Sequence, residues 1–273
     1  MTFRLGLIGY GTIASLALDC LARELKAPLD AVICLSRERG QARAAAMLEG
    51  VDRNLAHRRL VVSSLDALLE ERPDLVIEAA GHDALRDCGA RVLEAGADLL
   101  VTSVGALADE DLHGKLMAAS KNGGALILSS GAIGGLDILA AAKLAGIEDV
   151  TYTSRKPPRA WRGTKAESLL DLDTLASEAC FYEGDARGAA RDYPQNANVA
   201  ATLALHGAGF KATRVRLVAD PAVTGNVHEI RIRSACTDIS LKIEGRPSPD
   251  NPKTSLTTGY SVAAQLMQWM RRR

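Results

Sequence analysis

The sequence predicts an α/β protein in two parts: a doubly wound parallel sheet, a second α+β domain, and a C-terminal helix that returns to the first part. Two patterns predict this fold class. Up to about residue 130, short apolar runs alternate with stretches of helical spacing, as in a parallel sheet covered by helices. Beyond that point, three strand-like runs follow one another with no room for crossover helices, which favours antiparallel pairing.

The first part alternates in regular order, and Gly50 and Gly123 end two of its helices. Strands are expected at residues 3–9, 29–36, 60–64, 73–81, 97–104 and 124–131. Helices are expected between them, at residues 12–25, 37–48, 65–71, 83–96 and 109–123. We assign residues 1–130 together with 251–273 to this domain.

The second domain, residues 131–250, mixes both kinds of element. Strands are expected at residues 149–156, 214–220, 226–235 and 238–245. Helices are expected at residues 134–146, 167–179 and 198–209. The chain leaves this domain through a proline-rich loop, "RPSPDNPKTS", and we expect the last helix, at about 257–270, to pack on the first domain.

The composition excludes several classes of function. The 33 basic residues balance the 33 acidic ones and aromatic residues make up only 4%, so no nucleic-acid partner is expected. The five scattered cysteines are typical of reduced thiols, not of a disulfide framework or a zinc site, and no metal is expected. The chain starts directly in a strand and has no bilayer-length apolar run, so we expect a cytoplasmic protein without a membrane partner.

A glycine motif, "LGLIGYGTIA", lies between the first strand and the first helix. Gly9 permits a tight turn, and Gly11 lets the backbone approach a pyrophosphate. Thr12 and Ile13 begin the helix, where free N–H groups face an anion. The alternative is a glycine-rich turn without a ligand. The context favours a Rossmann domain that binds NAD or NADP.

The second strand ends in Ser36 and Arg37, where an acidic residue normally binds the adenosine ribose. A guanidinium at this place suits the 2′-phosphate of NADP. We therefore expect NADP to be accepted, alongside NAD, unless Arg37 is simply a solvated residue that enters the next helix.

Further candidates follow other strands. Because ligands bind at the carboxyl ends of parallel strands, we expect cofactor-cleft lining there. The residues concerned are Gly81, His82, Ser103 and Gly105, of which His82 is equally consistent with an exposed loop residue. Ala132, in "SSGAIGGLD", lies in a small-residue junction that is either a hinge or a surface for a flat ring. Asn198 is either a helix N-cap or a group that holds a carboxamide or carboxylate.

His228 interrupts a strand, "GNVHEIRIRS", on the face it shares with Ile230 and Ile232. An imidazole on that apolar face is either a buried histidine bonded to a backbone carbonyl or a group that faces a cleft. Imidazole, with an unperturbed pKa of about 6.5, suits proton transfer near neutral pH.

Taken together, five stretches resemble the L-aspartate dehydrogenase family over nearly the whole chain: "GLIGYGTIA", "GAIGGLDIL", "YPQNANVAATLALHG", "ADPAVTGNVHEI" and "PSPDNPKTSLTTGYS". The resemblance implies a Rossmann domain, an α+β domain that helps to form homodimers, and reversible NAD(P)-dependent oxidation of L-aspartate to iminosuccinate, which hydrolyses to oxaloacetate and ammonia. It implies His228 as the catalytic residue, with Ala132 and Asn198 as cofactor contacts. The basic end of the second strand departs from this pattern and leaves the cofactor preference open.

Other interpretations stay open from the residues alone. Lys253, in "NPKTS", is a candidate substrate-carboxylate contact or a surface lysine. The family resemblance further implies an imine product that is able to feed quinolinate, and thus pyridine nucleotide, biosynthesis. A related dehydrogenase acting on a substrate such as homoserine is the nearest alternative. A non-catalytic dinucleotide-binding regulator would keep the glycine motif but would not need His228 on an inward face.

Overall fold

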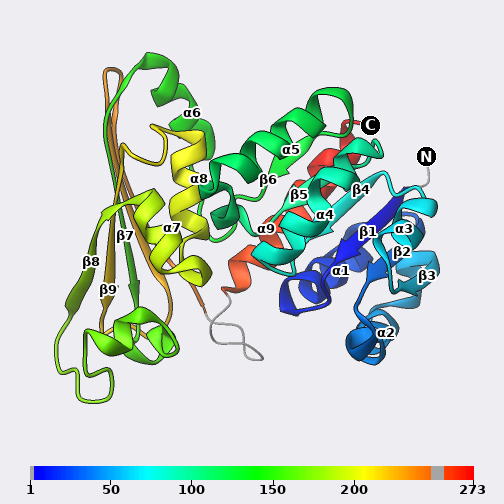
Figure 1. Cartoon of the computed structure of the whole chain (residues 1–273), viewed down its shortest axis with the longest axis horizontal. Helices are drawn as coiled ribbons and strands as arrows, with labels where there is room; N and C mark the ends of the chain where they lie inside the picture. Colours follow the sequence, from blue (N-terminus) through cyan, green and yellow to red (C-terminus); the bar gives the residue numbers. More distant parts are fainter. Residues whose placement is uncertain (1–2, 247–254) are drawn as a thin grey trace. The chain divides into compact units, whose positions relative to one another are not determined.

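The computed structural model describes residues 3–246 and 255–273 (Figure 1). The chain divides into two compact units, one formed by Met1–Ser129 with Thr258–Arg273 and the other by Ser130–Thr257. Each unit has its own sheet. The first is called the cofactor unit below and the second the histidine unit.

The cofactor unit contains a six-stranded sheet in the order β3-β2-β1-β4-β5-β6, with every neighbouring pair parallel. Its strands are β1 (Arg4–Ile8), β2 (Leu29–Leu35), β3 (Ala56–Val62), β4 (Leu75–Glu78), β5 (Asp98–Val101) and β6 (Leu126–Leu128). Its helices are α1 (Thr12–Glu24), α2 (Gln41–Gly50), α3 (Leu65–Glu70), α4 (His82–Glu94), α5 (Glu110–Asn122) and α9 (Leu256–Arg271). The strand order reverses between β1 and β4, which confirms the predicted doubly wound Rossmann fold.

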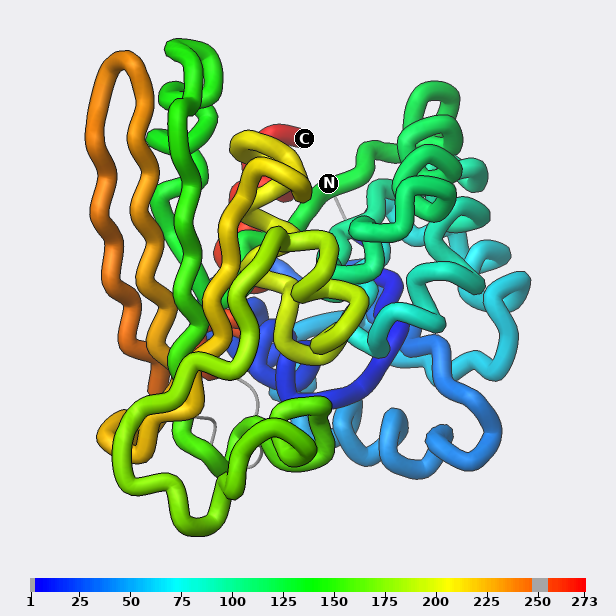
Figure 2. The backbone as a smooth tube through the Cα atoms, turned by 60° about the vertical axis from the view of Figure 1, so that its left-hand side comes forward, coloured from blue at the N-terminus to red at the C-terminus, as the bar shows by residue number. Residues whose placement is uncertain are grey.

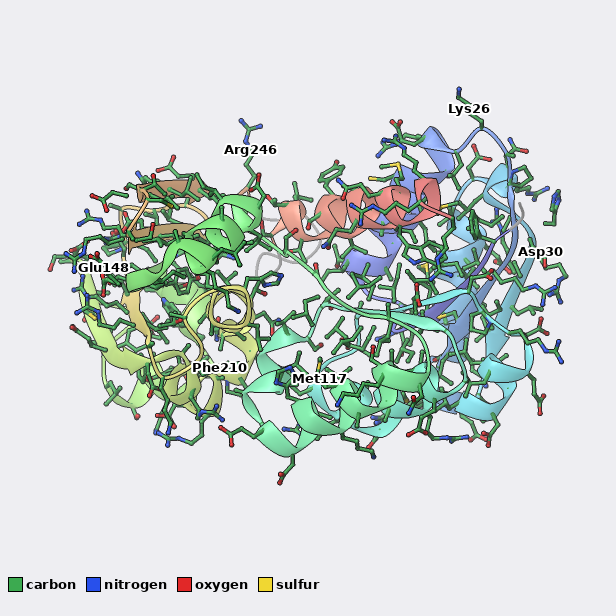
Figure 3. The ribbon with its side chains drawn as sticks, turned by 90° about the horizontal axis from the view of Figure 1, so that it is seen from above. Lys26, Asp30, Met117, Glu148, Phe210 and Arg246 are labelled. Carbon is green, nitrogen blue, oxygen red and sulfur yellow. The ribbon has the colours of Figure 1, made fainter. Side chains whose placement is uncertain are left out.

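Helices cover both faces of this sheet. Figure 3 shows α1 and α9 on one side and α4 and α5 on the other. Helix α9 is tied to β5 by Asp98, whose carboxylate accepts hydrogen bonds from Trp269 Nε1 at 2.6 Å and from Arg273 at 2.7 Å. It also packs its Gly259 against Leu16 of α1, where a side chain would clash. The predicted return of the C-terminal helix to the first domain is confirmed.

The histidine unit contains a five-stranded sheet in the order β11-β10-β7-β9-β8 (Figure 2). Its strands are β7 (Ile147–Lys156), β8 (Ala179–Asp185), β9 (Thr213–Ala219), β10 (Val227–Ser234) and β11 (Asp238–Glu244). Its helices are α6 (Leu136–Ala145), α7 (Ala186–Asp192) and α8 (Asn198–His206). These helices lie on one face of the sheet, where β7, β9 and β10 bury side chains, and the other face carries mostly charged residues.

The strand pairing of this sheet differs from the sequence-based expectation in one place. β10 is antiparallel to β11, as expected, but it does not pair with β9. Instead β10 pairs antiparallel with β7, and β9 runs parallel to β7 on its other side. The short connection at residues 220–226 does not form a hairpin between neighbours, because it crosses the end of β7 and places β9 and β10 on opposite sides of that strand. Strand β8, antiparallel to β9, was not predicted.

The helix predicted at residues 167–179 is wrong. Only a 3-10 turn at Lys165–Ser168 forms there, and β8 begins at Ala179. The carboxylate of Asp171 accepts hydrogen bonds from the backbone of Asp173 and from both the backbone and the hydroxyl of Thr174. Such local side-chain bonds compete with helical ones, so the chain turns instead of continuing as a helix.

Candidate active site

The glycine turn between β1 and α1 brings backbone close to backbone. Gly9 has φ +109°, and a Cβ on it would lie 2.6 Å from the carbonyl oxygen of Ala79. Gly11 precedes α1 with no side-chain cap, and a Cβ on it would meet no atom within 4 Å. The first N–H groups of α1, at Thr12 and Ile13, have no carbonyl partner within the helix, and such a helix start suits a pyrophosphate.

A cavity of about 480 Å³ opens beside this turn, at the carboxyl ends of β1, β2 and β4. It brings together four of the residues predicted to bind the cofactor: Gly9, Ser36, Arg37 and Gly81. His82 and Arg39 also line it. Ser103 and Gly105 are not among its lining residues and are buried instead. The cavity lies where the strand order reverses, the expected place for a dinucleotide in this fold.

The end of β2 is basic, not acidic. Ser36 is buried, and its hydroxyl donates to the backbone carbonyl of Arg37 at 3.1 Å. Arg37 and Arg39 are exposed side chains on the rim of the cavity. Two guanidinium groups at this rim add positive charge where the adenosine ribose of a dinucleotide is expected.

Glu78, at the end of β4, organises the same edge of the sheet. Its side chain is completely buried, and the carboxylate accepts hydrogen bonds from the backbone N–H groups of Ala80 and Gly81, each at 2.9 Å. It also accepts from the backbone and the hydroxyl of Ser103, at 3.1 and 2.9 Å. Glu78 is not among the residues predicted from the sequence. Its signal was a carboxylate at the end of an otherwise apolar strand, "LVIE".

We expect Glu78→Gln to weaken cofactor binding roughly tenfold and to lower the free energy of unfolding by about 1–3 kcal/mol. The amide must turn its NH₂ group toward N–H donors, so the loop at Gly81 loses acceptors. Fluorescence titration with NADPH and urea denaturation measure the two effects. Glu94→Gln, the same change at an exposed position of α4 that does not line the cavity, is the matched control. Unchanged NADPH affinity in Glu78→Gln would show that the carboxylate does not organise the cavity.

His228 occupies the buried face of β10 and is 4% exposed, as its alternation predicted. Its Nδ1 lies 2.7 Å from the Tyr152 hydroxyl on β7, and its Nε2 is buried with no hydrogen-bond partner among the described residues. Burial, together with the positive charge of Lys156, lowers the pKa of His228 to about 3. The imidazole is therefore uncharged at neutral pH, with one nitrogen held and the other available.

Tyr152 holds its own proton. Complete burial raises its pKa above the ordinary value of a tyrosine. Ser154 opposes that rise in pKa, although its Oγ does not meet the geometry of a hydrogen bond. A neutral hydroxyl at Tyr152 is able to donate to Nδ1 of His228 or to accept from it, so this contact holds the imidazole through Nδ1 in either tautomer.

The remaining predicted residues fall in different places. Ala132 is buried and Asn198 half-buried, and both belong to the histidine unit. Asn198 is the first residue of α8 and not its N-cap, which is Ala197, so the predicted capping role is wrong. Lys253 lies outside the described residues.

The parallel sheet, its glycine turn and the cavity at the point of strand reversal define a Rossmann-type dinucleotide-binding protein. Residues 9–129 match the family model described as homoserine dehydrogenase, NAD binding domain, and residues 137–269 match the one described as aspartate dehydrogenase, C-terminal. An L-aspartate dehydrogenase from Ralstonia nicotianae is 45% identical over 261 residues, 95% of each chain. The chain belongs to the L-aspartate dehydrogenase family.

Two further relatives agree with this placement. An L-aspartate dehydrogenase from Ruegeria pomeroyi is 44% identical over 268 residues, covering 97% of this chain and 92% of the relative. The crystal structure of aspartate dehydrogenase from Thermotoga maritima superposes with a TM-score of 0.70 at 25% identity, covering 100% of this chain and 97% of that one. Within residues 3–246 and 255–273, no helix combines the length and apolarity that crossing a membrane requires.

Proposed function

We propose that the chain oxidises L-aspartate to iminosuccinate with NAD or NADP, and that the imine hydrolyses to oxaloacetate and ammonia. Family membership supports the substrate, and one observation carries the chemistry: His228 is buried and uncharged, and no other described residue bonds to its Nε2 atom. The reaction removes a hydride from Cα and a proton from the amino group, so it needs a proton acceptor that is not already protonated.

The chain's own residues divide the work. The bound nicotinamide supplies the hydride acceptor. The turn at Gly9 and Gly11 and the start of α1 hold the pyrophosphate through backbone N–H groups. For Nε2 of His228 to accept a proton, Nδ1 must carry the ring hydrogen. The Nδ1–H group then donates a hydrogen bond to the Tyr152 hydroxyl, 2.7 Å away. In the reverse direction the same Nε2 returns the proton to the nitrogen.

The cofactor choice follows from the end of β2. Ser36 stands where an acid would repel a 2′-phosphate, and Arg37 and Arg39 supply cations at the cavity rim. These charges support acceptance of NADP as well as NAD. Ala132, Asn198 and Lys253 stay predicted contacts, the first two with the cofactor and the last with the substrate. The homodimer, the cytoplasmic location and the link to pyridine nucleotide biosynthesis also stay predictions.

The activity is tested by initial rates at the absorbance band of reduced nicotinamide. We expect oxidation of NADH or NADPH that requires oxaloacetate and ammonia together, with the rate falling to background when either is omitted. Oxidation without ammonia would contradict the proposal and indicate a hydroxy-acid dehydrogenase. Reduction of NAD(P) by homoserine but not by L-aspartate would assign the related activity. Tight NADPH binding without any turnover would favour a regulator.

A further inference from the structure

We infer that Lys156 is the cation that binds a carboxylate of the substrate. Asn196 and Trp161 hold the ammonium group of Lys156 in place. This inference rests on the proposed function and names the ligand of the same unit: a four-carbon dicarboxylate. The residues concerned all belong to the histidine unit.

A row of polar side chains lies on the buried face of this sheet. Side chains alternate along a strand, so Tyr152, Ser154 and Lys156 of β7 share one face. The register places His228 of β10 directly opposite Ser154. All four side chains are buried, at 0 to 7% exposure, on a face that is otherwise mostly apolar, with Thr213 and Ser234 as further buried polar residues. A sheet face packed only for stability would carry apolar residues at these positions, so the row indicates a ligand site.

Lys156 is an unusual residue to bury, because removing an ammonium group from water is costly. Its Nζ donates a hydrogen bond to Asn196 Oδ1 at 2.6 Å and lies 4.9 Å from the centre of the Trp161 ring. Both of these neighbours are neutral, so they orient the charge without cancelling it. The indole is itself fixed, since Trp161 Nε1 donates to the carbonyl of Val218 at 3.1 Å.

The atoms beside this cation suit an amino or keto acid. Ser154 Oγ and His228 Nε2 are both buried without a hydrogen-bond partner among the described residues. A carboxylate on Lys156 would accept from the ammonium, while the neighbouring nitrogen or oxygen of the substrate would engage His228. The charge of Lys156 already acts on the ring of His228, because it contributes to the lowered pKa. A bound carboxylate would offset that charge and raise the proton affinity of His228 when substrate is present.

The test uses succinate, a four-carbon dicarboxylate with no amino or keto group, and the cofactor-saturated full chain. Calorimetric titration is expected to show succinate binding by the wild type that weakens roughly 10- to 100-fold in Lys156→Met. Lys156→Arg, which keeps the charge, is expected to retain part of the affinity. Lys143→Met, at an exposed position on α6, is the matched control and should bind like the wild type.

Two further readouts separate binding from folding. Only two tryptophans occur in the chain, so in Trp269→Phe all tryptophan fluorescence comes from Trp161. This emission should change when succinate is added, and it should not change when Lys156→Met is also present. The KM for oxaloacetate should rise by a similar factor in Lys156→Met, while the affinity for NADPH stays that of the wild type. If Lys156→Met unfolds, succinate affinity is measured in Asn196→Ala instead. This variant should also bind succinate more weakly than the wild type, with a smaller loss than that expected for Lys156→Met.

The outcomes are distinct. Wild-type succinate affinity and wild-type KM in Lys156→Met would overturn the inference while leaving the proposed function intact. Loss of succinate binding in Lys156→Met, in a protein whose wild type shows no turnover of oxaloacetate and ammonia, would support the dicarboxylate site and overturn the proposed function.

Discussion

Replacement of His228 by alanine is expected to lower kcat for L-aspartate oxidation by about 10²- to 10⁴-fold, the usual contribution of a positioned general base. The fall follows from the loss of Nε2, which is buried without a partner among the described residues and is uncharged at neutral pH. The dissociation constant of NADPH should stay within about twofold, since the phosphate-binding turn lies in the cofactor unit. Stopped-flow absorbance and fluorescence titration measure the two quantities.

The control variant is His206→Ala. His206 is a second histidine of the same unit, at the end of α8, and its Nδ1 contacts the backbone carbonyl of Thr202 one turn earlier. Its kcat should match the wild type. Tyr152→Phe should reduce kcat less than His228→Ala does, because the imidazole loses only the contact that holds its Nδ1 and keeps Nε2. Wild-type kcat in His228→Ala would remove the residue from the mechanism.

The burial of His228 also makes the free energy of unfolding depend on pH. The pKa of His228 is about 3 in the folded chain and about 6.5 in the unfolded one, so the unfolded chain binds one more proton between these values. The contribution of His228 to the free energy of unfolding therefore falls by about 2 kcal/mol as the pH drops from 7 to 5. Urea denaturation of His228→Asn should lack this part of the pH dependence. Parallel curves for both proteins would contradict the lowered pKa.

The double substitution Ser36→Asp and Arg37→Ala is expected to shift the ratio of kcat/KM for NADPH over NADH by about 10²- to 10³-fold toward NADH. The new carboxylate accepts from the two ribose hydroxyls of NADH and repels a 2′-phosphate, and the lost guanidinium no longer binds it. Both positions line the cavity beside the glycine turn. Initial rates with each cofactor, at saturating oxaloacetate and ammonia, give the ratio.

Arg43→Ala removes an exposed arginine from α2 and controls for general charge effects. It should leave the ratio unchanged. An unchanged ratio in the double variant would show that the adenosine ribose is not held at the end of β2. A fall for both cofactors together would show that these residues shape the cavity without distinguishing the phosphate.

Local requirements made the cofactor unit predictable. Gly9 is recognisable in the sequence because its φ of +109° and the close carbonyl of Ala79 require glycine there. The alternation of strands and helices follows from apolar periodicity. The parallel pairing of β9 with β7 was not predictable in this way, because a seven-residue connection fits a hairpin as well as a crossing. Asp171 ended a helical pattern through hydrogen bonds that composition alone does not reveal.

The residues of the candidate site also divide into those that local sequence predicts and those that depend on the tertiary structure. His228 was predicted to face inward from alternation along its own strand, and it does. Tyr152 and Lys156 were missed because they matter only once β7 pairs with β10, although they too alternate in "TYTSRK". Asn196 reaches Lys156 from 40 positions away along the chain. Glu78 acts through backbone groups of the loop at Gly81 and of Ser103, which follows β5, and only its position at the end of an apolar strand marks it in the sequence.

The most direct measurement of the central claim is the fate of nitrogen. Oxaloacetate, ¹⁵N-labelled ammonium and NADPH are incubated with the protein, and the products are separated by chiral chromatography and analysed by NMR. We predict L-[¹⁵N]aspartate in an amount equal to the NADPH oxidised. Malate without label, at the same yield, would show that the hydride goes to a ketone and would contradict the assignment of an amino-acid dehydrogenase.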